Sequence, residues 1–82
     1  MKDNKKNILV TGGSGFIGTN LIIKLISLGY EVASFDERPP HIKVPGCQYI
    51  IGDMKNFRKD MTHFVLKNSF NVSDTACPCG IL

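Results

Sequence analysis

The sequence has little net charge, no excess of proline or glycine, and few residues in total. Its 82 residues include ten Lys and Arg, seven Asp and Glu, and 43% apolar residues. One globular domain usually takes about 100 to 200 residues, so the chain has room for one small domain or part of one. This ordinary composition excludes a disordered chain, and the length excludes an enzyme with a separate substrate lobe.

Long hydrophobic runs are also missing. The longest, residues 21–28, contains Lys24 and Ser27 and falls short of the ~20 apolar residues that a bilayer-spanning helix needs. The polar N-terminus leads directly into Ile8-Leu9-Val10, which is too short for the apolar core of a signal peptide. No aromatic residues lie between the N-terminal lysines, as a nucleic-acid-binding arm would require. We therefore expect a cytoplasmic protein that binds neither nucleic acid nor a membrane.

Cysteine and histidine are scarce as well. The three cysteines, Cys47, Cys77 and Cys79, are an odd number, and the last two are too close together for the usual zinc spacing. The same pair lacks the Cys-x-x-Cys spacing of redox-active thiols. His41 and His63 have no second ligand at helical spacing. We expect no metal site and no disulfide framework.

What the sequence does contain is the pattern of a parallel α/β fold. Ile8-Leu9-Val10 is a short apolar run that ends at glycines, as expected of a strand buried on both faces. Over residues 16–28, up to Gly29, apolar residues recur at helical spacing and cover most of the circumference, which predicts a helix lying against a sheet. Residues 31–35 and 48–51 have the composition of two further strands.

The C-terminal third is less regular. Phe57, Met61, Phe64 and Val65 are spaced as on an amphipathic helix. Residues 68–82 show neither helical nor strand periodicity, and we expect an irregular tail without a strand that extends the sheet. The predicted fold is thus a partial parallel sheet, ordered β-α-β-β, followed by a helix and this tail.

A glycine-rich turn joins the first predicted strand to the first predicted helix. Residues 11–18 are Thr-Gly-Gly-Ser-Gly-Phe-Ile-Gly. Such a turn lets a diphosphate approach the free N–H groups of a helix N-terminus with no Cβ in the way. In this interpretation Gly12 forms the tight turn, Gly15 admits the pyrophosphate, and Gly18 lets the helix pack closely on the strand. The alternative is a tight turn that binds nothing.

Two further features lie where a dinucleotide would need them. The N–H groups of Phe16 and Ile17 would face the phosphates, and the helix dipole would favour the negative charge. Asp36 follows the second strand, where its carboxylate can bind the ribose hydroxyls of adenosine and repel a 2′-phosphate, or simply end the strand. This favours NAD over NADP. Arg38 could pair with that phosphate, or be an ordinary surface residue beside Glu37.

These motifs resemble the start of an extended short-chain dehydrogenase/reductase of the NAD-dependent epimerase/dehydratase family. The resemblance covers residues 7–57 and rests on Thr-Gly-x-x-Gly-x-x-Gly, on Asp36, and on Gly-Asp-Met after the third strand. It implies a Rossmann-like sheet in which Asp36 and Glu37 hold the adenine ribose while Asp53 and Met54 flank the adenine. Asp53 can also accept a hydrogen bond from the exocyclic amine, or cap the helix that follows.

The catalytic pair of that family is missing. Its members handle the substrate proton with a tyrosine and with a lysine four residues later. The two tyrosines here are Tyr30 and Tyr49, and the residues four positions on are Ser34 and Asp53. We therefore expect no catalytic residue in this chain.

The resemblance implies that longer relatives are NAD-dependent enzymes acting on a nucleotide-sugar or a related hydroxyl or keto substrate. We interpret residues 1–57 as the dinucleotide-binding portion, and residues 58–82 as a divergent helix and tail that form no separate domain. Two alternatives stay open. One is a non-catalytic dinucleotide-binding or interaction module, in which another protein chain completes the open sheet edge. The other is a truncated fragment without independent activity.

Overall fold

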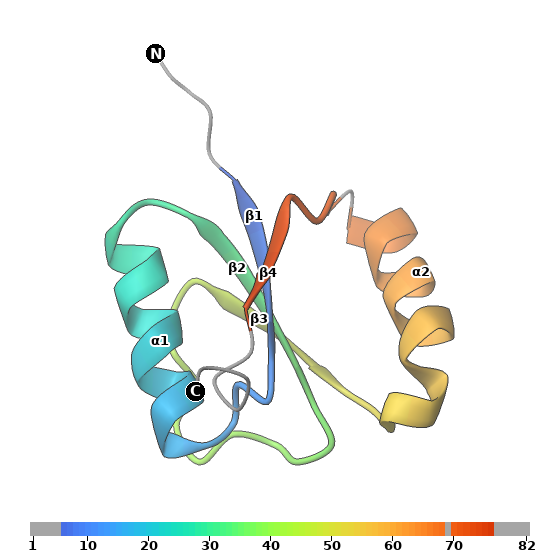
Figure 1. Ribbon diagram of the computed structural model, residues 1–82, viewed down its shortest axis with the longest axis horizontal. Helices are drawn as coiled ribbons and strands as arrows, with labels where there is room; N and C mark the ends of the chain where they lie inside the picture. The colour runs from blue at the N-terminus through green and yellow to red at the C-terminus, as the bar shows by residue number, and fades with distance from the viewer. Residues whose placement is uncertain (1–5, 69, 77–82) are drawn as a thin grey trace.

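The described part of the chain, residues 6–68 and 70–76 of a computed structural model, is a parallel sheet between two helices. The elements are β1 (Asn7–Thr11), α1 (Phe16–Ser27), β2 (Glu31–Asp36), β3 (Cys47–Ile51), the 3-10 helix η1 (Met54–Asn56), α2 (Phe57–Asn68) and β4 (Asp74–Ala76). Figure 1 shows α1 and α2 on opposite sides of the sheet. The predicted α/β fold class is confirmed.

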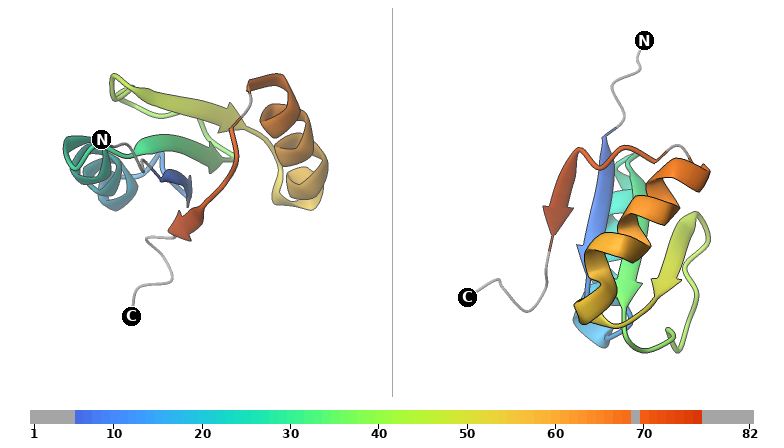
Figure 2. Two further views of the ribbon diagram at one scale, coloured as in Figure 1. Left: turned by 90° about the horizontal axis from the view of Figure 1, so that it is seen from above. Right: turned by 90° about the vertical axis from the view of Figure 1, so that its right-hand side faces the viewer.

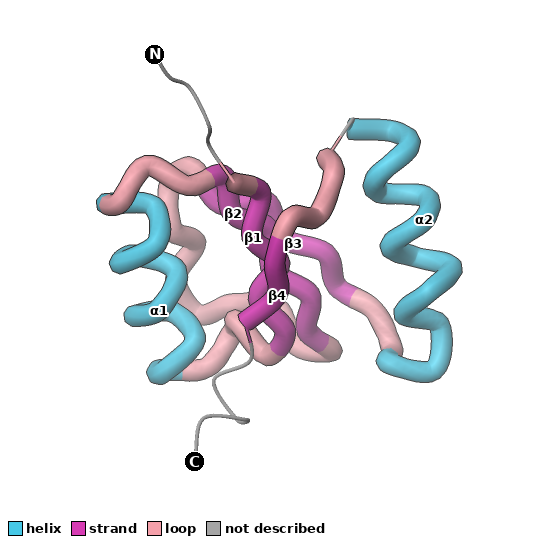
Figure 3. Tube along the Cα trace, turned by 45° about the horizontal axis from the view of Figure 1, so that its top comes forward, coloured by secondary structure: helices cyan, strands magenta, loops and turns pink. Residues whose placement is uncertain are grey.

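The strand order defines where a ligand would bind. The sheet is ordered β3-β2-β1-β4 and every pair is parallel. Figure 3 shows the strands, in magenta, between α1 and α2. The chain moves outward from β1 to β3 and then returns to the other side of β1. In parallel α/β sheets, ligands bind at the carboxyl ends of strands beside such a reversal. The topology therefore predicts a ligand site at the carboxyl end of β1, where the glycine turn begins.

The prediction that residues 68–82 contain no strand is wrong. Asp74–Ala76 form β4, which pairs in parallel with β1 from Ile8↔Asp74 to Val10↔Ala76. Figure 2 shows β4 beside β1, on the side away from β2. The sheet therefore has four strands. The rest of the expected tail, residues 77–82, lies outside the described residues.

Backbone hydrogen bonding explains why this short segment becomes a strand. Without β4, the central strand β1 would leave its outer row of N–H and C=O groups unpaired, which is costly for a buried strand. Hydrogen bonds at Asn7 hold the segment just before β4 beside β1. The Ser73 N–H donates to the Asn7 carbonyl at 2.8 Å, and the Asn7 side-chain amide donates to the Asn71 carbonyl at 2.9 Å.

Alternation along the strands divides the core into two layers. Ile8 and Val10 of β1 face α1, whereas Leu9 between them faces α2, so β1 is buried on both faces as predicted. On the α2 side, the rings of Phe35 and Phe57 meet edge-on with centroids 4.9 Å apart. The buried members of the α1 layer are Ile8, Val10, Ile22, Val32 and Val44, and those of the α2 layer are Leu9, Ala33, Phe35, Met61 and Phe70.

Helix α1 lies against the sheet as predicted, but its apolar surface is wider than that contact. Gly18 and Ile22 are buried on the sheet side. Phe16, Ile17 and Ile23 remain 84%, 64% and 49% exposed. The apolar residues that cover most of the helix circumference therefore leave an uncovered face in this chain.

Two further findings concern the described residues as a set. Neither helix of the described part has the length and apolar character needed to cross a membrane. Within residues 6–68 and 70–76, no three His, Cys, Asp or Glu side chains gather in a way that could hold a metal ion.

Candidate functional site

The glycine turn lies at the carboxyl edge of the sheet, between β1 and α1. Gly12 has a φ of +76°, which residues with a Cβ rarely adopt, and its N–H donates to the Phe35 carbonyl at 2.8 Å. A Cβ on Gly18 would lie 2.5 Å from the Gly12 carbonyl oxygen and 2.7 Å from the Gly13 Cα. The close packing that Gly18 permits is therefore between α1 and the backbone of the glycine turn.

The N-terminus of α1 offers free donors to this edge. Gly15 is the N-cap, no side chain caps the helix, and the first-turn hydrogen bond runs from the Thr19 N–H to the Gly15 carbonyl at 2.8 Å. The N–H groups of Phe16 and Ile17 therefore have no intrahelical acceptor. A Cβ on Gly15 would meet no atom within 4 Å, and the first turn carries no acidic side chain. An anion fits this position by charge and by hydrogen bonding.

The carboxylate of Asp36 faces the glycine turn from the end of β2. Its Oδ2 accepts a hydrogen bond from the Ser14 N–H at 3.0 Å, and its Oδ1 accepts one from the Arg38 N–H at 3.1 Å. An ionised carboxylate has about four acceptor sites, so roughly two stay free for hydroxyl donors. The structure thus places a carboxylate acceptor on the same cavity as the N-terminus of α1.

Ser14 is a residue that the sequence analysis missed. Its side chain is buried, and its Oγ donates to the Arg38 carbonyl at 2.6 Å. The two residues are 24 positions apart, so no local pattern could have linked them. The only sequence signal is the position of Ser14 between two glycines of the turn.

A cavity of ≈ 700 Å³ joins these groups into one site. Its volume lies in the range of about 300–1,000 Å³ that is typical of small-molecule pockets. Its lining contains six of the nine residues predicted to bind the cofactor, whereas Ile17, Gly18 and Asp53 lie outside it. The full lining is Thr11, Gly12, Ser14, Gly15, Phe16, Phe35, Asp36, Glu37, Arg38, Pro39, His41 and Met54.

Asp53 has a structural role that the sequence analysis offered as an alternative. It is the N-cap of η1, and its Oδ1 accepts a hydrogen bond from the Lys55 N–H at 2.9 Å. The neighbouring Met54 lines the cavity and is 53% exposed. The Gly52 N–H donates to the Asp36 carbonyl at 3.0 Å, which ties this segment to the end of β2. The cap is confirmed, and contact between Asp53 and an adenine stays a prediction.

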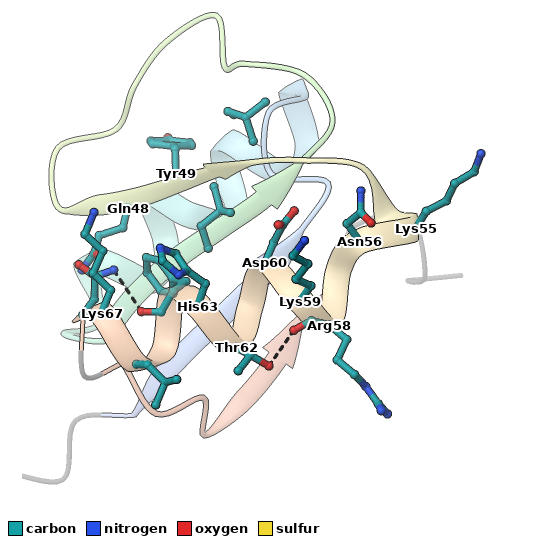
Figure 4. A pocket seen from close by; sticks show the side chains of 15 residues that line it. Gln48, Tyr49, Lys55, Asn56, Arg58, Lys59, Asp60, Thr62, His63 and Lys67 are labelled. Carbon is teal, nitrogen blue, oxygen red and sulfur yellow. Dashed lines mark hydrogen bonds between the residues drawn. The ribbon is translucent and has the colours of Figure 1, made fainter.

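A larger cavity of ≈ 1120 Å³ lies between β3 and α2. Figure 4 shows its side chains, among which Lys55 and Arg58 point away in different directions. None of the nine predicted binding residues lines it. Size alone therefore does not identify the functional site, and the smaller cavity at the glycine turn has the matching chemistry.

The thiol of Cys47 is expected to react slowly. Burial raises its pKa from 9.0 to about 11, against the opposing effect of a hydrogen bond with Tyr49. A rise of two pKa units lowers the thiolate fraction at pH 8 by about 100-fold, and the thiolate is the reactive form. Iodoacetamide should therefore modify Cys47 about 100-fold more slowly in the native chain than in the urea-unfolded chain, as measured by mass spectrometry of its peptide. Equal rates in the two states would contradict this expectation.

The fold is one half of a Rossmann-like sheet, with a glycine-rich turn after β1 and an acidic residue, Asp36, at the end of β2. The chain belongs to the NAD dependent epimerase/dehydratase family, whose model matches residues 8–71. The matched range runs past residue 57, where the sequence analysis ended the resemblance. The family model therefore also matches helix α2.

Individual relatives agree with the family assignment. The chain is 46% identical over 50 residues to a 3-beta-hydroxysteroid dehydrogenase of Mycolicibacterium neoaurum, covering 60% of this chain and 14% of that protein. It is 34% identical over 77 residues to the short-chain dehydrogenase/reductase family 42E member 1 of Bos taurus, covering 93% of this chain and 18% of that protein. The chain thus spans less than a fifth of the length of either relative.

A solved structure shows the same arrangement. The short chain dehydrogenase of Leptospira borgpetersenii, solved with bound NAD+, matches with a TM-score of 0.63 and 30% identity. The match covers 79% of this chain and 26% of the other.

Proposed function

We propose that this chain is the NAD-binding portion of an epimerase/dehydratase-type short-chain dehydrogenase. The observation that carries the proposal is the Asp36 carboxylate, which the Ser14 N–H holds beside the glycine turn at 3.0 Å. It lines the same cavity as Gly15 and Phe16 at the N-terminus of α1. Donors for a diphosphate and an acceptor for its sugar therefore stand at one end of one sheet.

The residues present fit NAD, which supplies a hydride acceptor when it is bound. In this proposal the N–H groups of Phe16 and Ile17 bind the pyrophosphate, and Asp36 with Glu37 binds the adenine ribose. The open space beside Gly15 supports the first assignment. The negative charge of Asp36 would repel a 2′-phosphate, which supports NAD over NADP. Asp53 and Met54 would flank the adenine.

The proposal gives this chain a binding role and no catalytic residue. Neither tyrosine is followed by a lysine at the fourth position. Tyr49 lies in β3, where its hydroxyl accepts a hydrogen bond from the Val44 N–H at 3.0 Å, which supports a structural role. In longer relatives, the dinucleotide would act on a nucleotide-sugar or a related hydroxyl or keto substrate, and residues 1–57 would supply the cofactor-binding part.

Two observations favour the second candidate, a module that a further polypeptide completes. An apolar cavity of ≈ 590 Å³ opens between α2 and β4. Within the described residues β4 pairs only with β1, so its outer edge is free to accept another strand. Size-exclusion chromatography separates the candidates, since a monomer that binds NAD would favour the first. A melt without a cooperative transition would favour a fragment without independent function. The cavity is lined by Leu9, Phe57, Arg58, Met61, Thr62, Val65, Leu66, Val72 and Thr75.

Titration with NAD tests the proposed function directly. Calorimetry should give a saturable binding isotherm, and the amides of residues 15–18 should become protected from hydrogen exchange. ADP-ribose should bind comparably, because every predicted contact is with the adenosine diphosphate half. Nicotinamide mononucleotide should bind much more weakly and serves as the matched control. The absence of any response at millimolar NAD would rule the proposal out.

A further inference from the structure

We infer that Ser14 is a positioning residue that sets the cofactor selectivity of this site, an inference that rests on the proposed function. Its side chain is buried, although serine is usually exposed. The inference concerns how Ser14 holds Asp36 and the backbone of Arg38, and it assigns Ser14 no contact with the cofactor.

Three hydrogen bonds close a ring between the glycine turn and the segment after β2. The Ser14 N–H donates to Oδ2 of Asp36 at 3.0 Å, and the Ser14 hydroxyl donates to the Arg38 carbonyl at 2.6 Å. The Arg38 N–H completes the ring by donating to Oδ1 of Asp36 at 3.1 Å. Because both peptide groups of Arg38 and both oxygens of Asp36 take part, no member of the ring can shift without breaking a bond.

The ring fixes the direction of the Asp36 carboxylate. Each oxygen is engaged by one backbone donor, so the remaining acceptor sites keep a constant direction within the cavity. Loss of the Ser14 hydroxyl would release the Arg38 carbonyl and allow the segment after β2 to move. The N–H of Arg38 would then leave Oδ1, and the carboxylate, held only by the backbone N–H of residue 14, could rotate.

Such a movement would change the affinities for the two cofactors in opposite directions. A rotated carboxylate accepts the ribose hydroxyls less well, which weakens NAD binding. It also opposes a 2′-phosphate less strongly, while the exposed Arg38 side chain lines the same cavity and can approach that phosphate. The ratio of NAD affinity to NADP affinity should therefore fall.

This ratio separates positioning from a purely structural role. A variant that is partly unfolded binds both cofactors less well by the same factor, because only the folded fraction binds. Its NAD to NADP ratio stays that of the wild type. Only a change in the geometry of the site moves the ratio.

The experiment compares Ser14→Ala and Ser14→Cys with the wild-type 82-residue chain. Calorimetric titrations with NAD and with NADP should show NAD affinity reduced about tenfold in Ser14→Ala, as expected for one lost hydrogen bond. The ratio of NAD affinity to NADP affinity should fall at least about fivefold, a change that one hydrogen bond of ordinary strength can account for. Ser14→Cys nearly preserves the side-chain shape but donates a weaker hydrogen bond. Its affinity ratio should therefore lie between those of the wild type and Ser14→Ala. It also keeps the test available if Ser14→Ala does not fold.

Ser27→Ala is the matched control. It also removes a serine hydroxyl that donates to a backbone carbonyl, that of Lys24 at 2.7 Å, at the far end of α1 from the turn. Its ratio should equal that of the wild type. A wild-type chain that binds no NAD would refute the proposed function itself. If the wild type binds NAD and both Ser14 variants keep its ratio, the function stands and the positioning role is refuted.

Discussion

Replacing Gly18 with alanine should destabilise the chain by about 1–3 kcal/mol, the typical cost of overpacking a tight contact. The new methyl group would collide with the Gly12 carbonyl oxygen and the Gly13 Cα, and both are backbone atoms that cannot turn aside. Alanine's better helix propensity offsets only up to about 1 kcal/mol of this loss. Urea unfolding should show a lower midpoint. NAD affinity should fall too, because relief of the collision displaces the turn.

Gly15→Ala is the informative comparison for this variant. A Cβ at Gly15 meets no atom within 4 Å, so the unfolding free energy should change by less than about 1 kcal/mol, the usual size of an N-cap effect. Its methyl group would instead stand in the space proposed for the pyrophosphate, and NAD binding should weaken. Gly18→Ala should therefore act mainly on stability and Gly15→Ala mainly on affinity. Equal losses of stability in the two variants would show that the close contact at Gly18 is wrongly assigned.

The second large effect is expected from Asp36→Asn. Hydrogen bonds to a charged group contribute about 1.5–3 kcal/mol, so NAD affinity should fall roughly 10- to 100-fold. The loss of negative charge should at the same time reduce the repulsion of a 2′-phosphate, and NADP affinity should rise relative to NAD. Parallel titrations with the two cofactors measure both changes.

Glu31→Gln controls for the loss of one negative charge from the same strand. Glu31 begins β2 and is exposed, whereas Asp36 ends the strand at the site. The control should leave both affinities within about twofold, since surface substitutions away from special features usually change free energies by less than about 0.5 kcal/mol. Similar losses of NAD affinity in the two variants would mean that only the net charge matters, and that Asp36 has no specific contact with the cofactor.

The elements that local patterns specify could be predicted from the sequence. β1, α1 and β2 were predictable because the apolar run, the helical spacing and the glycines act within a few residues of one another. The position of Asp36 beside the turn followed from these elements, since parallel strands place their carboxyl ends at one edge. Helix α2 was predictable from its apolar spacing, beginning at Phe57.

The features that depend on distant contacts could not be predicted. β4 has the sequence Asp-Thr-Ala, which has little intrinsic preference for a strand, and it forms because β1 offers it a free edge. The bond from Ser14 to Arg38 joins a turn to a loop and leaves no periodic trace in the sequence. The exposed face of α1 could not be predicted either, because the spacing of apolar residues does not show how much of each residue the sheet covers.

The pairing of β4 with β1 also bears on how the chain assembles. β1, α1 and β2 are neighbours in the sequence, whereas β4 must return from the far end of the chain to reach β1. Closing that long loop loses more entropy than joining the neighbours, so β4 should dock last and detach first. Every residue that lines the cavity at the glycine turn precedes β4 in the chain. This cavity can thus be complete while β4 is still undocked, ahead of the strand that extends the sheet.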